Sequence, residues 1–226
     1  MFILSSMHFL YAGEYLIEEP VNTIKTVKAI IFDVDGVVFN SLDENGRYLW
    51  SKNIKSDLGI CGEHFKLIFS DRWDDVTRGK TTTKDHLRSV FMHEIFNELR
   101  ENGLTPDSYI NYWLSHDGNI NLEMIGFVKQ FTIPVYLGTN QDEHRTRHIV
   151  ECVGHFFTGC FASYQIGHIK TEKEFFEYIQ NKLQLKPDEL ILIDDTKANI
   201  DGARACGWNA FLYQNNLEDL KRFIQN

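Results

Sequence analysis

The chain has 226 residues, a formal net charge of −9, and 43% hydrophobic and 24% charged residues. This length and composition are typical of a soluble globular protein with one sizeable α/β domain and room for a smaller insert. The acidic balance disfavours a broadly basic binding surface, so we expect no nucleic-acid partner. No run is long and apolar enough to predict a membrane span, so we expect no membrane partner either.

The first 26 residues are predicted to be an N-terminal extension. They lack a basic start and contain early acidic residues such as Glu14, unlike a secretory signal peptide. The four cysteines form no Cys-x-x-Cys pair. Reduced thiols in a cytoplasmic compartment fit this usage best, so we expect a cytoplasmic protein.

Short apolar runs followed by polar residues predict the strands of a sheet. They lie at 27–32, 133–137, 190–193 and 208–213, with a weaker candidate at 156–162. Near-continuous apolar runs of this length fit strands that are covered on both faces, as in a parallel sheet. Helical patterns separate the runs, so the fold class is α/β, a doubly wound parallel sheet.

Two helices of this core have clear signals. The Thr-x-x-Glu pattern at 171–174 predicts a capping box, followed by Phe175 and Ile179 at helical spacing. Residues 196–206 carry Ile200 and Ala203 on one face, and Gly207 is expected to end that helix.

The segment 41–124 is predicted to be a small all-helical cap domain inserted into a core formed by 27–40 and 125–226. An apolar face runs from Leu87 to Leu99, and Gly103 is expected to end it. Thr105 and Pro106 then have the pattern of an N-cap and first helical residue. We expect the three tryptophans of this segment in its core and not as stacking platforms for a ligand; they are Trp50, Trp73 and Trp113.

Polar residues follow three of the predicted strands. Because the carboxyl ends of parallel strands meet at one edge of a sheet, these side chains should converge there. Clustered carboxylates repel one another, and a hard divalent cation such as Mg²⁺ removes that problem and commonly bridges to phosphate. The pattern therefore indicates phosphoryl chemistry. The residues concerned are Asp33 and Asp35, Thr139 and Asn140, and Asp194 and Asp195.

Four motifs in order resemble those of the haloacid dehalogenase (HAD) superfamily. They are Asp33-Val34-Asp35-Gly36-Val37-Val38, Leu137-Gly138-Thr139-Asn140, Lys170 after Ile169, and Ile193-Asp194-Asp195-Thr196 with the residues up to Ala203. The resemblance implies a Rossmann-type core. The helical insert is similar to the small cap of glucose-1-phosphate phosphatases, phosphoglycolate phosphatases and β-phosphoglucomutase. Val37, Asn40 and Thr171 depart from the usual motifs, which leaves the subfamily less defined than the chemistry.

The resemblance implies a catalytic role for three residues. Asp33 is the expected nucleophile and becomes an aspartyl-phosphate. Asp35 is the expected general acid and base, and must hold a proton while Asp33 stays ionised. Lys170 is expected to offset charge between Asp33 and the phosphate.

The resemblance also implies a Mg²⁺ cofactor and a phosphate site. The implied metal site consists of Asp33, the backbone carbonyl of Asp35, Asp194, and Asp195, which acts through water or instead positions Lys170. Thr139 and the backbone N–H of Asn140 are the implied phosphate donors. Asn199 either assists the metal site or is an ordinary polar helix position.

A short cationic loop at 77–80 has two interpretations. Arg78 and Lys80 are candidate substrate contacts, because a similar cap loop sets specificity in some relatives of the superfamily. The alternative is a solvated turn between helices. The nine histidines show no metal-ligand spacing.

The predicted function is Mg²⁺-dependent hydrolysis of a small phosphorylated metabolite, a sugar phosphate or nucleotide-like monoester. A phosphomutase is the main alternative, because the same residues would serve it. A haloacid dehalogenase and a non-catalytic binding module fit less well, because the acidic residues are all retained. We expect a monomer or a homodimer.

Overall fold

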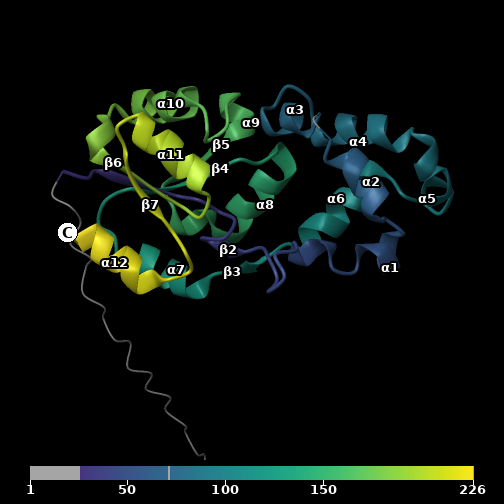
Figure 1. Ribbon diagram of the computed structural model, residues 1–226, viewed down its shortest axis with the longest axis horizontal. Helices are drawn as coiled ribbons and strands as arrows, with labels where there is room; N and C mark the ends of the chain where they lie inside the picture. The colour runs from purple at the N-terminus through teal and green to yellow at the C-terminus, as the bar shows by residue number, and fades with distance from the viewer. Residues whose placement is uncertain (1–25, 71, 226) are drawn as a thin grey trace, which may run out of the picture.

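The structure, a computed structural model, describes residues 26–70 and 72–225 (Figure 1). The predicted extension therefore lies outside the described residues, apart from residue 26. Figure 1 shows an α/β part built around a sheet and, to one side of it, a part made mostly of helices. Within the described ranges, no helix has the length and apolar character needed to cross a membrane.

Five parallel strands form the central sheet, as the sequence predicts. Their order is β5 (Gly159–Ala162), β4 (Val135–Thr139), β1 (Ala29–Phe32), β6 (Leu190–Asp194) and β7 (Asn209–Leu212). The weak candidate at 156–162 is thus a strand. Phe32 pairs with Leu137 on one side and Ile193 on the other. This register brings the carboxyl ends of β1, β4 and β6 level at one edge.

Helices cover both faces of the sheet because successive strand residues point to opposite sides. Ile30 and Phe32 face one apolar cluster, whereas Ala29 and Ile31 face the other. The first cluster is covered by α7 (Leu122–Val128), α8 (Glu143–Val153) and α12 (Leu217–Gln225). The second is covered by α10 (Lys173–Leu183) and α11 (Lys197–Ala205), and the short helix α9 (Ser163–Ile166) follows β5. The predicted doubly wound architecture is therefore confirmed.

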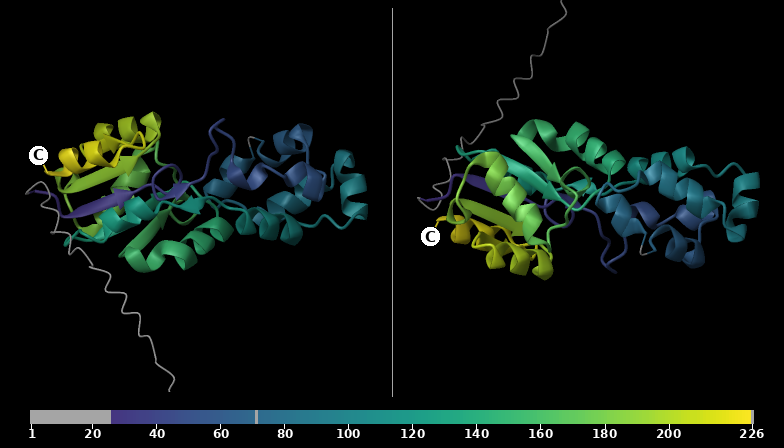
Figure 2. Two further views of the ribbon diagram at one scale, coloured as in Figure 1. Left: turned by 90° about the horizontal axis from the view of Figure 1, so that it is seen from below. Right: turned by 90° about the horizontal axis from the view of Figure 1, so that it is seen from above.

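The helical part has an apolar core of its own, which includes Trp50 and Trp113. Its helices are α1 (Ile54–Leu58), α2 (Gly62–Ile68), α3 (Trp73–Thr77), α4 (Thr83–Phe91), α5 (Asn97–Glu101) and α6 (Pro106–Ser115). Two views at right angles to Figure 1 show this part extending from one end of the α/β part (Figure 2). Because α7 begins at Leu122 and packs Met124 against the sheet, the last residues assigned to the cap from sequence belong to a core helix.

Two short strands join the parts, so the inserted segment is not helical throughout. β2 (Phe39–Asn40) pairs antiparallel with β3 (Asn119–Ile120). A Cβ at Gly118 would lie 2.7 Å from the Asn40 carbonyl oxygen. The chain leaving the α/β part and the chain returning to it can therefore approach closely only with glycine at 118.

The expected apolar face from Leu87 to Leu99 is interrupted. α4 ends at Phe91, and His93 has extended backbone angles before a 3₁₀ turn at Glu94–Phe96 and then α5. The His93 ring accepts the Ile95 N–H, which favours this break over a continuous helix. The apolar residues nevertheless share one core cluster.

Helix ends agree with the sequence in three places and differ in a fourth. Gly103 has a φ of 94° just after α5. Thr105 caps α6 with Pro106 in its first turn, and Gly207 has a φ of 81° just after α11, as predicted. The capping box at 171–174 is wrong, because the N-cap of α10 is Glu172 and its side chain does not cap the helix. The Glu172 carboxylate instead accepts the Ile169 N–H and pairs with Arg78.

Candidate active site

The loop after β1 presents Asp33 and Asp35 at the carboxyl edge of the sheet. The Asp33 N–H donates to the Ile193 carbonyl of β6 at 2.8 Å, and the Asp33 carboxylate accepts the Val34 N–H at 2.7 Å. Gly36 has a φ of 73°, a region that glycine enters without strain. A Cβ at Gly36 would also lie 2.0 Å from an Asp195 carboxylate oxygen. Glycine therefore allows the two acidic loops to meet.

Three carboxylates gather at this edge. Asp33, Asp194 and Asp195 each offer an oxygen, and these atoms lie within 4.8 Å of one another. The Lys170 ammonium lies 2.5 Å from Asp33 Oδ1 and 2.7 Å from Asp194 Oδ2, and donates to the Gly138 carbonyl at 3.0 Å. One lysine does not balance three carboxylates, and an all-oxygen donor set suits a hard divalent cation. The residues present therefore fit a metal such as Mg²⁺.

Burial and neighbouring charges shift the pKa values of this cluster. Burial raises the pKa of Asp33 well above its ordinary value; Lys170 opposes this shift, and Asp194 adds to it. Burial, followed by the charge of Asp194, also raises the pKa of Asp195. For Lys170, burial alone lowers the pKa, but Asp33 and Asp194 outweigh burial and raise it. A cation placed among these oxygens would favour the ionised carboxylates.

Asp194 is held by the start of the following helix. Asn199 donates its side-chain N–H groups to both Asp194 oxygens, at 3.0 and 3.1 Å, and the Thr196 N–H donates to one of them at 2.9 Å. Asn199 thus contacts the acidic cluster rather than serving only as a polar helix position. Lys170 pairs with Asp33 and Asp194, so the structure gives no support to the suggestion that Asp195 positions it.

The end of β4 supplies the two residues expected to bind phosphate. Thr139 is the last residue of the strand and is buried. The Asn140 side-chain oxygen accepts the Lys170 N–H at 2.9 Å. Asn140 therefore fixes the backbone at Lys170, a role that the sequence did not suggest.

The Asp35 carboxylate takes part in a second network beside the acidic cluster. Arg145 on α8 donates to both its oxygens, at 2.5 and 2.6 Å, and Gln141 donates to one at 2.7 Å. The Ser41 hydroxyl also donates to Asp35. Arg145 further makes two 3.0 Å bonds to Asp117, which lies where the chain returns from the helical part. The network ties Asp35 to both connections between the parts.

This network was missed from sequence. Burial by itself raises the pKa of Asp35, but the charge and hydrogen bonds of Arg145 and the Ser41 hydroxyl outweigh it and lower the pKa. The sequence reasoning expected the reverse, a proton held on Asp35. Arg145 is one of two arginines two residues apart on α8, and nothing local distinguishes it from Arg147, which is exposed.

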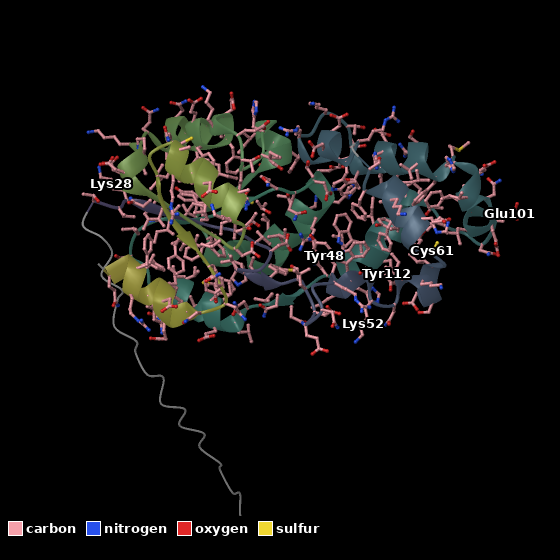
Figure 3. All side chains as sticks on the ribbon, viewed as in Figure 1. Lys28, Tyr48, Lys52, Cys61, Glu101 and Tyr112 are labelled. Atoms are coloured by element: carbon pink, nitrogen blue, oxygen red, sulfur yellow. The ribbon has the colours of Figure 1, made fainter. Side chains whose placement is uncertain are left out.

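A cavity of about 600 Å³ opens beside Asp35, between the two parts of the molecule. The α/β part contributes Asp35, Asn140, Gln141 and Arg145 to its lining. The helical part contributes six aromatic residues, which are Tyr48, Trp50, Phe65, Phe69, Trp73 and Trp113. Figure 3 labels Tyr48 near the boundary between the parts, far from Lys28 at one end and Glu101 at the other.

Arg78 and Lys80 are not among the residues that line this cavity. Arg78 pairs with Glu172 of the α/β part, and Lys80 pairs with Asp75 on the surface. A Cβ at Gly79 would lie 2.1 Å from the Tyr164 carbonyl oxygen. The 77–80 loop is therefore a contact between the parts at Arg78 and Gly79, whereas Lys80 is solvent-exposed, and a substrate contact by Arg78 or Lys80 stays a prediction.

Taken together, the fold and site define a Rossmann-type α/β protein with a lysine-bridged cluster of aspartates at the carboxyl edge of its sheet. The sequence model of haloacid dehalogenase-like hydrolases matches residues 27–207. The chain belongs to this family of hydrolases. Membership of the small-cap subgroup stays a prediction.

Three proteins are similar to the chain over most of its length. It is 25% identical over 190 residues to a sesquiterpene phosphatase of Aspergillus oryzae, covering 80% of this chain and 87% of that one. A HAD-like family hydrolase of Porphyromonas gingivalis has a TM-score of 0.68 at 18% identity, over 89% and 99% of the chains. A HAD family enzyme of Bacteroides thetaiotaomicron, solved with magnesium and inorganic phosphate, has a TM-score of 0.66 at 20% identity, over 86% and 98%.

Proposed function

We propose that the protein is a Mg²⁺-dependent phosphatase, which hydrolyses the phosphate monoester of a small molecule through an aspartyl-phosphate on Asp33. The observation that carries this proposal is the cluster in which Lys170 bridges Asp33 and Asp194. The similarity to a sesquiterpene phosphatase supports phosphate ester hydrolysis. The magnesium and phosphate bound by the structural neighbour support the ion.

The carboxylates of Asp33, Asp194 and Asp195 would hold the ion, and the backbone carbonyl of Asp35 remains a further proposed ligand. Bound there, Mg²⁺ supplies positive charge that favours ionised Asp33 and offsets the charge of the phosphate. Asn199 keeps Asp194 oriented toward the site through its two hydrogen bonds.

Asp33 attacks phosphorus in this proposal. Both Lys170 and the Val34 N–H contact Oδ1 of Asp33, so we assign the attack to Oδ2. Lys170 faces Asp33 and Asp194 with its ammonium group and lowers the repulsion that an incoming phosphate meets. Thr139 and the Asn140 N–H at the end of β4 are the proposed phosphate donors.

As Asp33 attacks, the ester P–O bond breaks and Asp35 gives its proton to the leaving alcohol oxygen; Asp35 then acts as the base. Arg145 favours the ionised carboxylate, which suits removal of a proton from the water that attacks the aspartyl-phosphate. For the first step Asp35 must carry a proton. The negative charge of a phosphate bound nearby raises the pKa of a carboxyl group and favours that protonated form.

The test is release of inorganic phosphate from a panel of monoesters, with Mg²⁺ and with EDTA. We expect release only with Mg²⁺, and its loss in Asp33→Asn. Asp188→Asn is the matched control, because Asp188 is an exposed residue just before β6, at the opposite edge of the sheet. Full turnover in Asp33→Asn contradicts the proposed nucleophile, and an isomeric sugar phosphate in place of inorganic phosphate indicates a mutase.

A further inference from the structure

The leaving group of the proposed reaction has a defined place in the structure. Asp35, which is proposed to protonate the leaving oxygen, lines the cavity together with Asn140 at the end of β4. A phosphate held at Asp33 therefore directs its organic group past Asp35 and into the cavity. The chemistry of the opposite wall then decides which organic group fits.

That wall is a continuous aromatic surface. The Trp50 ring lies 5.5 Å from Trp113 and 5.7 Å from Phe65, centre to centre, and the Phe69 ring lies 4.8 Å from Trp73. The ring centres of Trp73 and Trp113 are 6.0 Å apart, so the Phe69–Trp73 pair is in contact with the Trp50–Trp113 pair. Such contacts are the preferred spacings of aromatic pairs, so the wall is assembled before a ligand arrives.

Part of this aromatic surface remains uncovered. Phe69 is 37% exposed and Tyr48 is 51% exposed, and both residues line the cavity. Large apolar groups on a concave surface gain free energy when an apolar ligand removes them from water. The cavity volume of about 600 Å³ falls within the range of roughly 300–1,000 Å³ that is typical of small-molecule sites.

Polar partners for a sugar or a nucleobase are sparse. Besides indole N–H groups, the described part of the helical wall offers the side chains of Arg47, Ser51 and Tyr48. The Ser51 hydroxyl already donates to the Tyr48 carbonyl. At the other end, Asp35 binds Arg145 and Gln141, and the Asn140 side-chain oxygen accepts the Lys170 N–H. Over the aromatic wall a sugar would lose hydrogen bonds to water that few groups replace, which is costly, whereas a hydrocarbon group would lose none.

We infer that the cavity takes an apolar organic group, so that the substrate is the monophosphate of a hydrocarbon-like alcohol and not a sugar phosphate or a nucleotide. This inference rests on the proposed phosphatase function, and it replaces the polar metabolite that the sequence suggested. The aromatic wall is then the feature that selects the substrate.

The test compares ethyl, hexyl and decyl phosphate with glucose phosphate and adenosine monophosphate. With Mg²⁺, kcat/KM should rise about twofold to fourfold for each methylene that enters the cavity, because each buried methylene contributes a similar transfer free energy. Hexyl and decyl phosphate should exceed both polar substrates. Equal kcat/KM across the alkyl series, or preference for either polar substrate, overturns the inference while the phosphatase proposal stands.

Variants at Phe69 assign the effect to the wall. Phe69→Ser should lower kcat/KM for decyl phosphate about tenfold and for ethyl phosphate far less, whereas Phe69→Leu should retain the dependence on chain length. Tyr178→Ser is the matched control, because Tyr178 on α10 is similarly exposed, at 43%, but does not line the cavity. Equal losses for both alkyl esters in Phe69→Ser contradict the inference.

A binding measurement separates the two proposals. Decylphosphonate, which resists hydrolysis, should bind the wild-type protein with Mg²⁺ more tightly than ethylphosphonate, and should change tryptophan fluorescence because Trp50, Trp73 and Trp113 line the cavity. If no ester is hydrolysed but decylphosphonate binds preferentially, the phosphatase proposal fails and the apolar site stands. If the two phosphonates bind equally, the apolar site fails whatever the activity.

Discussion

Replacing Arg145 with methionine removes the guanidinium group that joins Asp35 to Asp117. Arg145 and Asp117 have side chains only 4% and 3% exposed, so the variant leaves a buried carboxylate without its partner. Breaking a buried ion pair in this way costs about 3–5 kcal/mol of stability. The Asp35 side chain is 28% exposed and can be rehydrated, so we expect the lower end, about 3 kcal/mol.

Urea unfolding at neutral pH measures this loss. With a denaturant dependence of about 2 kcal/mol per molar, the midpoint should fall by roughly 1.5 M. Arg147→Met is the control on the same helix, because Arg147 is exposed, and its effect should stay within about 0.5 kcal/mol. A loss below about 1 kcal/mol in Arg145→Met would refute the view that this ion pair ties the two parts together.

The same variant tests the sign of the pH dependence. The pKa of Asp35 is lowered in the folded protein, so its interaction with Arg145 stabilises the fold above the unfolded pKa, about 3.9. That contribution disappears as the pH falls through the lowered pKa. The stability difference between wild type and Arg145→Met should therefore be full at neutral pH and shrink below about pH 4. A difference that stays constant down to pH 3 contradicts the argument.

Three further substitutions probe the acidic cluster and the buried cap of α8. Gly36→Ala should lower the free energy of unfolding by about 1–2 kcal/mol, measured by thermal unfolding, because of the positive φ at this position. The variant should also need more Mg²⁺ for activity because the added Cβ displaces Asp195, and an unchanged Mg²⁺ dependence would count against that contact. Asn199→Ala should weaken Mg²⁺ affinity about 10–100-fold by freeing Asp194, whereas an unchanged titration would assign Asn199 no such role. Asp142 is the buried N-cap of α8, and burial raises its pKa. Its ionisation therefore disfavours the fold as the pH rises above the unfolded pKa, about 3.9, so Asp142→Asn should gain stability relative to wild type in that direction; a pH-independent difference contradicts this.

The sheet and its acidic edge could be predicted from sequence because both depend on local patterns. Apolar runs such as 27–32 define strands, and parallel pairing alone brings Asp33 and Asp194 to the same edge. The Arg145 network could not be predicted, because its partners Asp35 and Asp117 lie 110 and 28 residues away along the chain. No spacing rule connects residues at such separations.

The helical part shows the same limit. Its tryptophans were expected in the core of the helical part, and Trp50 and Trp113 do lie there. That the same rings also line a cavity beside Asp35 depends on how two separately packed parts meet. The loop at 77–80 had two interpretations, a substrate contact or a solvated turn, and neither suggested that Arg78 pairs with Glu172 across the boundary.

The measurement that tests the central claim most directly is borohydride trapping during turnover with Mg²⁺ and a cleaved monoester. An aspartyl-phosphate is an acyl phosphate, which borohydride reduces to the alcohol with loss of phosphate, so Asp33 should become homoserine. Peptide mass spectrometry should find this change at Asp33, dependent on substrate and Mg²⁺. Turnover with an unmodified Asp33, or reduction at Asp35 or Asp194 instead, would contradict the account.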